Sequence, residues 1–362
     1  MSKLEEARRE IDRVDEEMRR LFQARMDAVA LVAAYKKEHG LAIFDPAREA
    51  QVVEAGAQRL PREDLRPYYV EFLRHTMAVS RNYQSRLLSG LRAAYSGAAG
   101  AFGELAAKRI FPTAETISYP SFRDAYDAVK NGESDLAVLP LENSVHGDVG
   151  QVMDLIFFGD LVVSGVYDVA VTQHLLGVPG ATPASVKKVL SHPQALGQCA
   201  AFLREKGYET EERVNTAVAA REVAEAGDPA LAAIGSAEAG EAYGLVRLAE
   251  RVNSDGDNTT RFAVLTRSRK DPSPRDRNFI LLFTVKNEAG GLARAITAIG
   301  AHGYNMRALK SRPARDLAWS YYFFCECEGN IYDSEGRALM RELNIVCQDV
   351  KIAGSYEKDI KI

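Results

Sequence analysis

The chain has 362 residues, more than one ordinary globular core accommodates, so about two to four domains are expected. Its composition, 46% hydrophobic and 27% charged, excludes a disordered chain and a membrane protein. The formal net charge of −4 gives no overall attraction to nucleic acid or anionic lipid, so an anionic ligand requires a local cluster of basic side chains.

The four cysteines and the N-terminal residues indicate the cellular compartment of the protein. Cys199, Cys325, Cys327 and Cys347 are too few and too irregularly spaced for a disulfide framework or a four-thiolate zinc site, so no metal site is predicted. The first residues lead directly into charged helical sequence, without the apolar core or cleavage site of a signal peptide. We therefore expect a cytoplasmic protein.

Residues 1–90 predict an all-helical domain. Apolar residues recur at spacings of three and four over residues 3–38, with no glycine or proline between them, which predicts one long amphipathic helix. A second helix is expected to begin at Asp45-Pro46, because the carboxylate can cap it and proline suits the first helical position, and to end before Pro61. A third is expected over residues 67–88.

From residue 91 the pattern changes to short apolar runs that alternate with helices. This alternation predicts an α/β domain over residues 91–268, followed by a charged, proline-containing linker at 268–277. Residues 278–357 predict a compact two-layer module in βαββαβ order. Its strands are expected at 279–285, 306–311, 319–327 and 346–355, and its helices at 291–302 and 334–342.

Three basic residues disturb the apolar seam of the first helix. Arg25 occupies a place in a seven-residue series that should be apolar, and Arg8 and Lys36 flank the seam. One such side chain can extend into solvent, but three together predict a bound anion, because unpaired cations in a helical core are unfavourable. Arg8 and Lys36 lie 28 residues apart, about 42 Å along a helix, so one chain cannot bring both to a small ligand. We predict a site shared between the subunits of a dimer.

These basic positions belong to a pattern that resembles the all-helical chorismate mutase family over residues 1–88. The residues that carry the resemblance are Arg8, Arg25, Lys36, Asp45, Arg48, Glu49, Ser80 and Gln84. The resemblance implies an intertwined dimer in which Arg8 and Arg25 hold the two carboxylates of chorismate, and Lys36 and Gln84 donate to its ether oxygen. The rearrangement to prephenate requires no nucleophile, metal or cofactor, only a folded substrate and donors for the developing negative charge. Glu49 would be protonated in this role, or would serve the hydroxyl or the water structure instead.

Polar clusters follow apolar strands of the α/β region, and ligands bind at such strand ends in open α/β sheets. The clusters are Glu142-Asn143-Ser144, Ser191-His192-Pro193-Gln194, Asn215-Thr216-Ala217 and Asn258-Thr259-Thr260-Arg261-Phe262. In this order they resemble prephenate dehydratase over about residues 91–267. The family implies two α/β subdomains joined by two crossings, like a bacterial solute-binding protein, with the active site in the cleft between them. Its glycine loop usually has Ser or Thr where this chain has Gly103.

The resemblance also implies roles for these residues. Thr260 would assist the departing hydroxyl, with Arg261 beside it on a substrate carboxylate. An alcohol is too weak an acid to lose its proton at neutral pH, so we interpret Thr260 as a hydrogen-bond donor. The polar lining would comprise Glu142, Asn143, Ser144, Ser191, Gln194 and Phe262. Each of the polar residues is equally consistent with a helix cap or turn residue, and His146 and His192 with histidines that only satisfy backbone groups.

The C-terminal module resembles the ACT domain, a regulatory fold that binds amino acids between paired copies. The residues expected to bind the effector are Gly290, Gly291, Leu292, Asn305, Met306, Ser311, Arg312 and Pro313. In dehydratases of this class they imply feedback inhibition by phenylalanine. Two positions depart from the family pattern, because Lys310 stands where a Glu is usual and Arg307 where a small polar residue is common.

The leading hypothesis is a homo-oligomeric, cofactor-independent bifunctional enzyme of phenylalanine biosynthesis, which converts chorismate to prephenate and then to phenylpyruvate. Neither a nucleic acid nor a membrane is expected as a partner. Two alternatives remain open: a dehydratase whose helical domain only dimerises, and a binding protein for amino acids or other small molecules without catalysis.

Overall fold

The computed structural model describes residues 2–145, 147–254, 258–268, 273–313, 321–357 and 360–361. The chain divides into two compact units, Met1–Arg92 and Ala93–Ile362. Across the described ranges, no helix combines the length and the apolar character needed to cross a membrane.

The first unit is helical, as predicted. It consists of α1 (Lys3–Glu38), α2 (Pro46–Arg59), a short 3₁₀ turn η1 (Glu63–Leu65) and α3 (Arg66–Ser89). Ser2 and Glu5 form a reciprocal capping box at the start of α1. The Asp45 carboxylate accepts from the Arg48 amide at the start of α2, where Pro46 takes the first helical position. Both predicted helix starts are therefore confirmed.

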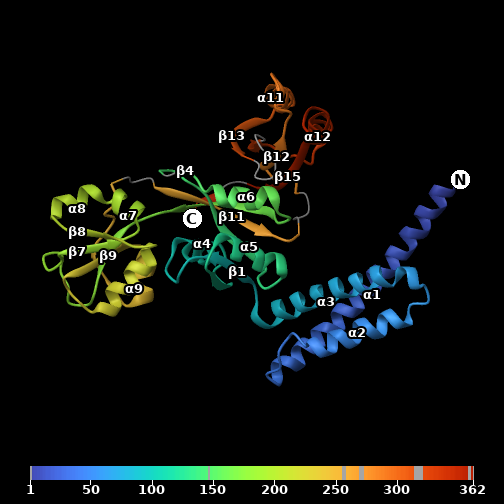
Figure 1. The fold of residues 1–362 in the computed structure, drawn as a ribbon, viewed down its shortest axis with the longest axis horizontal. Coiled ribbons are helices and arrows are strands. Elements are labelled where there is room, and N and C mark those ends of the chain that lie inside the picture. Colours follow the sequence, from blue (N-terminus) through green and yellow to red (C-terminus); the bar gives the residue numbers. More distant parts are fainter. Residues whose placement is uncertain are drawn as a thin grey trace. The chain divides into compact units, whose positions relative to one another are not determined.

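The N-terminal half of α1 has no cover within its own unit. Residues 2–24 are all exposed, and their apolar seam is represented by Leu4, Ile11 and Leu21, which are 59%, 59% and 60% exposed. Figure 1 shows these dark blue turns extending beyond α2 and α3. Exposed apolar surface of this extent is typical of an interaction site.

The second unit contains a large mixed sheet and a smaller sheet. The large sheet has the order β13-β14-β12-β15-β5-β11-β3-β1-β2, with β4 paired to β3 and β16 to β5. Its strands are β1 (Arg92–Ser96), β2 (Glu115–Tyr119), β3 (Leu136–Asn143), β4 (Gly147–Asp148), β5 (Val162–Ala170), β11 (Thr259–Thr266), β12 (Asn278–Thr284), β13 (Asn305–Pro313), β14 (Tyr321–Glu328), β15 (Asp349–Tyr356) and β16 (Ile360–Lys361). Helices α4 (Phe102–Ile110), α5 (Phe122–Asn131) and α6 (Gly150–Phe158) accompany it.

The smaller sheet has the order β10-β6-β9-β7-β8. Its strands are β6 (His174–Gly177), β7 (Lys188–Ser191), β8 (Glu209–Glu212), β9 (Leu231–Gly235) and β10 (Val246–Ala249), with helices α7 (Pro193–Gln198), α8 (Ala200–Lys206), α9 (Thr216–Ala226) and α10 (Ala237–Tyr243). The chain passes from the large sheet to the small one between β5 and β6 and returns between β10 and β11 (Figure 1). This is the predicted α/β architecture of two subdomains joined by two crossings.

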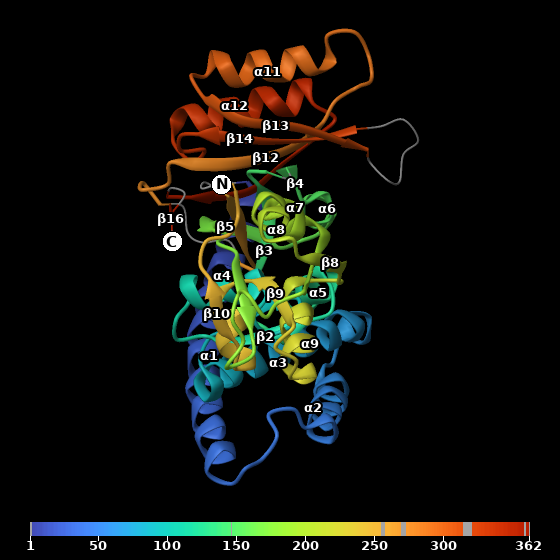
Figure 2. The same cartoon turned by 90° about the vertical axis from the view of Figure 1, so that its left-hand side faces the viewer.

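The C-terminal module has the predicted βαββαβ order: β12, α11 (Gly291–Ala301), β13, β14, α12 (Ser334–Val346) and β15. Figure 2 shows both helices on the same side of its strands. One boundary was predicted wrongly, because α12 continues through Val346 and the last strand begins only at Asp349. Leu339, Leu343 and Val346 keep helical spacing and pack on the module's core, which extends the helix.

The face of the module's strands that points away from α11 and α12 packs against the α/β part. Ile280, Leu282 and Phe324 belong to one buried cluster with core residues of the large sheet, among them Val163 and Leu265. Sequence patterning predicted a separate third domain, whereas the observed β15 lies beside β5 and continues the sheet. Burial of these apolar side chains joins module and α/β part into one packed unit.

Gly354 makes that junction possible. It pairs in parallel register with Val163, and a Cβ added at Gly354 would lie 2.0 Å from the Val163 carbonyl oxygen. This neighbour is backbone and cannot rotate away. We expect Gly354→Ala to destabilise the second unit by about 1–3 kcal/mol, as overpacking does, measured by thermal and urea unfolding.

Gly300→Ala is the matched control. Gly300 lies within α11, and no heavy atom lies within 4 Å of an added Cβ. We expect stabilisation of about 0.5–1 kcal/mol, because alanine favours a helix over glycine. Equal unfolding midpoints for Gly354→Ala and the wild type would contradict the proposed role of the junction.

Candidate functional sites

The helical unit brings Arg25 of α1 against α3. An Arg25 guanidinium nitrogen donates to Ser80 Oγ, and Ser80 Oγ donates to the Thr76 carbonyl at 2.8 Å. Ser80 and Gln84, one helical turn apart on α3, are 4% and 7% exposed. Among the described atoms, the buried Gln84 Oε1 has no hydrogen-bond partner, which is uncommon for a buried polar atom.

A second group of predicted residues surrounds the start of α2. The Lys36 ammonium donates to the Ile43 carbonyl, and Asp45 serves as the helix cap. Glu49 pairs with Arg81 of α3, whose guanidinium carbon lies 5.1 Å from the Phe44 ring centroid. The sequence interpretation missed Arg81, although it directly follows Ser80.

Arg8 remains apart from both groups. It lies on the exposed half of α1, far along the helix from Lys36. The structure therefore assembles Arg25, Ser80 and Gln84 within one chain but leaves Arg8 exposed, which is the separation that the shared-site prediction requires.

Thr260 lies where β11 pairs with the end of β3. It is in register with Asn143, and Asn143 Nδ2 donates to Thr260 Oγ1 at 2.9 Å and to Asn258 Oδ1 at 2.8 Å. Asn143 Oδ1 accepts from the Val145 amide at 3.0 Å, which fixes the orientation of the Asn143 amide. Since Thr260 Oγ1 already accepts from Asn143, its own proton can be donated elsewhere.

The neighbouring turn locks these strand ends together. The Ser144 amide donates to the Thr259 carbonyl at 2.9 Å, and the Thr259 amide donates to Ser144 Oγ at 3.0 Å. Asn258 is 2% exposed. Asn143, Ser144 and Thr260 are therefore brought together, and Asn258 joins them, a residue that the sequence placed in a polar cluster but not among the lining residues.

Arg261 points to the opposite face of β11. Its Nη1 and Nη2 each lie 2.8 Å from a Glu326 carboxylate oxygen in β14 of the C-terminal module. Successive strand residues alternate between the two faces of a sheet, so the Thr260 and Arg261 side chains leave β11 on opposite faces. In this structure the Arg261 guanidinium pairs with Glu326, and its expected contact with a substrate carboxylate stays a prediction.

The same alternation places Glu142, which was expected to line the substrate site, on the Arg261 face of the sheet. Its carboxylate lies 3.0 Å from the Lys310 ammonium and 3.8 Å from Arg261, so it faces the module. Phe262 was expected to contact substrate, but it is 2% exposed and serves as a packing residue of β11.

Two predicted lining residues come from the smaller sheet. Ser191 is fully buried, and its hydroxyl donates to the Ile234 carbonyl at 2.7 Å, which stabilises β7 against β9. Gln194 is exposed on α7, and its backbone N–H donates to His192 Nδ1 at 3.2 Å. His192 is thus the cap of α7, the alternative considered for it, while His146 lies outside the described residues.

The predicted effector residues lie at separate places on the module. Gly290 has φ +79° and precedes α11, and a Cβ at Gly291 would lie 2.5 Å from the Lys286 carbonyl oxygen, so both positions favour glycine. Leu292 and Met306 pack partly on the module's core. Ser311 and Pro313 are exposed at the end of β13.

Arg312 binds the α/β part. Its Nε lies 2.8 Å from Asp154 in α6, and Tyr322 Oη donates to the same carboxylate at 2.7 Å. Hydrogen bonding to Asp154 raises the pKa of Arg312. Burial, followed by this contact with Asp154, raises the pKa of Tyr322. Lys310, the departure from the family pattern, pairs with Glu142 and Asp148 and therefore also joins the module to the α/β part.

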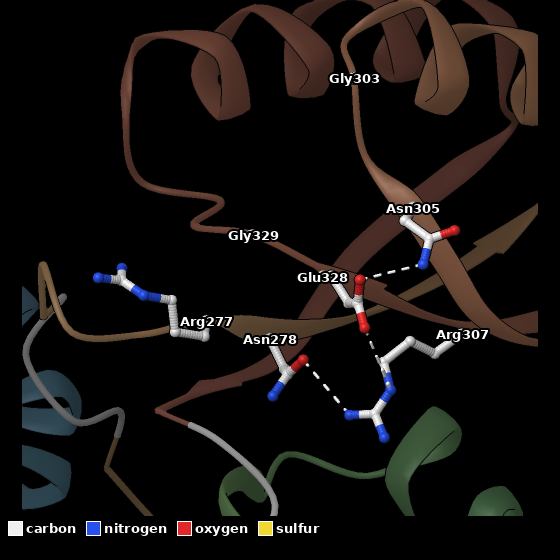
Figure 3. Close-up of a pocket in the computed structure, with 7 residues that line it drawn as sticks. All are labelled: Arg277, Asn278, Gly303, Asn305, Arg307, Glu328 and Gly329. Carbon is white, nitrogen blue, oxygen red and sulfur yellow. Dashed lines mark hydrogen bonds and ion pairs between the residues drawn. The ribbon is translucent and has the colours of Figure 1, made fainter.

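A groove of about 520 Å³ lies at the other end of β13. Asn305 Nδ2 donates to Glu328 at 3.0 Å, and Arg307 contacts Asn278 at 3.4 Å (Figure 3). The Arg277 side chain points away from this cluster. Asn305 is the one predicted effector residue among the groove's lining residues.

No group of three or more His, Cys, Asp or Glu side chains in the described ranges is arranged to hold a metal ion.

Comparisons with known proteins identify the family of two segments of the chain. Residues 7–85 match the family described as Chorismate mutase type II, and residues 93–270 match Prephenate dehydratase. These ranges contain the Arg25–Ser80 and Thr260–Asn143 contacts respectively.

A curated relative covers almost the whole chain. The bifunctional chorismate mutase/prephenate dehydratase of Aquifex aeolicus (strain VF5) is 31% identical over 369 residues, which span 99% of each protein.

Solved structures resemble the part outside the helical unit. The prephenate dehydratase of Arthrobacter aurescens in complex with L-Phe has a TM-score of 0.69 at 26% identity and covers 74% of this chain and 90% of its own. GqqA, described as a novel type of quorum quenching acylase, also has a TM-score of 0.69, at 30% identity, with 73% and 97% covered. The chain belongs to the family of bifunctional chorismate mutase/prephenate dehydratases.

Proposed function

We propose that the chain catalyses two consecutive steps of phenylalanine biosynthesis, from chorismate to prephenate in the helical unit and from prephenate to phenylpyruvate in the α/β part. The observation that carries this proposal is that both family matches occur in one chain, each over the segment that contains the corresponding polar cluster.

The mutase site is completed by a second subunit. Arg25 would hold one substrate carboxylate, Arg8 of a partner subunit the other, and Lys36 and Gln84 would donate to the ether oxygen. The exposed seam of α1 supports this dimer, because its burial supplies the driving force for association. The C–O bond breaks as the C–C bond forms, and the cations stabilise negative charge on the departing oxygen.

Glu49 pairs with Arg81 of α3, which holds its carboxyl group at the start of α2. There it would contact the substrate hydroxyl or the water structure of the site. Asp45, already the cap of α2, would orient this end of the site.

Dehydration depends on Thr260 as a donor. The bond between the ring and its carboxylate breaks to release carbon dioxide, the electron pair enters the ring, and the ring hydroxyl leaves, stabilised by a hydrogen bond from Thr260 and converted to water by a proton from the solvent. Asn143 donates to Thr260 Oγ1, which directs the Thr260 proton towards the leaving oxygen. Ser144, and Gln194 from the smaller sheet, would contact the substrate's remaining polar groups.

The C-terminal module is an ACT domain that senses L-phenylalanine. Its βαββαβ order and its glycines at the start of α11 support this assignment, as does the similar dehydratase solved with L-Phe. The effector would bind between paired modules, at Gly290 to Leu292 of one and Asn305 to Met306 of the other. Ser311 and Pro313 would border this site, and Arg312 would connect it to Asp154.

The cytoplasm is the proposed location. All four cysteines are free thiols, and Cys325 Sγ and Cys327 Sγ lie 3.5 Å apart without a bond. Free, adjacent thiols suit a reducing compartment.

Arg25→Ala should lower mutase kcat/KM at least about 100-fold, because one cationic donor to the transition state is lost. Formation of prephenate from chorismate measures this effect. Dehydratase activity on supplied prephenate should stay within about twofold.

Arg13→Ala provides the control for Arg25→Ala, since Arg13 lies on the same helix and pairs only with Glu10 and Glu17 among the described ion pairs. Its mutase activity should match the wild type. Full mutase turnover by Arg25→Ala would refute the assigned site.

Thr260→Val should lower dehydratase kcat about 100-fold or more, because valine keeps the shape but cannot donate a hydrogen bond to the leaving oxygen. Phenylpyruvate formation from prephenate measures this effect, and mutase activity should be unchanged. Thr266→Val is the control. Thr266 lies on the same strand, but its hydroxyl donates a hydrogen bond to the Ser268 carbonyl at 3.0 Å, so this variant should leave both activities intact. A Thr260→Val rate within threefold of the wild type would exclude Thr260 as the donor.

A further inference from the structure

A buried carboxylate of the C-terminal module holds the residue next to Thr260. Glu326 is 1% exposed, and its two oxygens each lie 2.8 Å from the Arg261 guanidinium. Tyr356 Oη donates to the same carboxylate at 2.6 Å, and Arg307 Nη1 lies 3.4 Å from it. This is the planar, two-point pairing that guanidinium and carboxylate favour, and it fixes direction as well as distance.

Glu326 is held in its ionised form. Burial would raise its pKa, but the hydrogen bonds and charge of Arg261, the Tyr356 hydroxyl and the charge of Arg307 outweigh burial, and the pKa of Glu326 is lowered. A lowered carboxyl pKa means that this contribution to stability is present at neutral pH and is lost as the pH falls through that pKa. The pair is therefore intact under the conditions in which the enzyme works.

Arg261 occupies an irregular point of the sheet. In the pairing of β11 with β3, Arg261 lies opposite Glu142 but Phe262 lies opposite Pro140, so Leu141 is an extra residue on β3. Such bulges re-aim neighbouring side chains and are common beside active sites. On the other side, Arg261 Nε lies 3.5 Å from Asp168 of β5. The direction of the Thr260 side chain thus depends on how Arg261 is anchored.

We propose that Glu326 is a positioning residue for dehydration: by anchoring Arg261 across the module interface, it fixes the end of β11 that faces the bulge of β3, and hence the Thr260 hydroxyl. The inference rests on the proposed role of Thr260. It assigns the C-terminal module a direct part in the geometry of the dehydratase site, and any shift of β14 in the module is passed to Thr260 through one ion pair.

The test is a double-mutant cycle in the full chain with Arg261→Gln, Glu326→Gln and the double variant, assayed on prephenate. Glu326→Gln should lower dehydratase kcat about tenfold, with KM within twofold and mutase activity unchanged. If Glu326 acts through Arg261, the double variant loses no more than the more severe single variant. A Glu326→Gln kcat within twofold of the wild type, or a double variant whose loss is the product of both single losses, would overturn the proposal.

Two further variants keep the test decisive. Tyr356→Phe removes one hydrogen bond to Glu326 and keeps its charge, so a smaller fall in kcat without a change in KM is expected even if Glu326→Gln unfolds the second unit. An unchanged Tyr356→Phe kcat in that case would overturn the proposal. Lys351→Gln removes a different polar contact between module and α/β part, to the Ile156 carbonyl, and should leave kcat within twofold.

The two levels of inference can fail separately. Normal dehydration by Thr260→Val would defeat the proposed function itself. Normal dehydration by Glu326→Gln together with an inactive Thr260→Val would defeat only the positioning role.

Discussion

Alternation of side chains along β11 is the constraint on which the dehydratase part depends. Thr260 and Arg261 are neighbours in sequence, yet a strand sends them to opposite faces of the sheet. One face receives Asn143, which orients the Thr260 hydroxyl, and the other receives Glu326, which anchors Arg261. Thr260, the proposed hydrogen-bond donor, and Arg261, the link to the C-terminal module, are therefore consecutive residues of β11 on opposite faces of the sheet.

Several other contacts join the module to the α/β part, and two of them lie apart from Arg261. Gly354 lets β15 approach β5, and Arg312 reaches Asp154 of α6. Apolar burial supplies stability across this interface, whereas the ion pairs fix its register. An effector that moved the module would therefore have a short, packed route to Thr260, since packed interfaces transmit displacement rather than absorb it.

The helical unit follows a different constraint, that of length. A straight helix holds Arg8 and Lys36 too far apart to meet one small molecule. Its exposed apolar seam and its separated cations both indicate a second copy, and the same association would bury the seam and complete the site. In the proposed dimer, the cations on this seam would serve a ligand.

Much of the fold could be predicted because its signals are local. Asp45-Pro46 marks the start of α2, and the βαββαβ order of the module follows from apolar periodicity alone. The pairing of β15 with β5 could not be predicted. Gly354 and Val163 are far apart in sequence, and the two strands pair at a single register position.

Site prediction from sequence had a similar limit. Motifs correctly drew attention to the segment from Asn258 to Phe262, but all its polar residues were assigned to one site, whereas the strand divides them between two faces. Strand alternation was the available signal and would have separated Thr260 from Arg261. Glu326, Asp154 and Arg81 carried no such signal, because their partners come from distant elements.

A crystal structure of the enzyme with an unreactive prephenate analogue tests the central claim most directly. The account predicts that Thr260 Oγ1 lies within about 3 Å of the analogue's ring hydroxyl, while Arg261 stays paired with Glu326. An Arg261 guanidinium that instead binds a carboxylate of the analogue would contradict it.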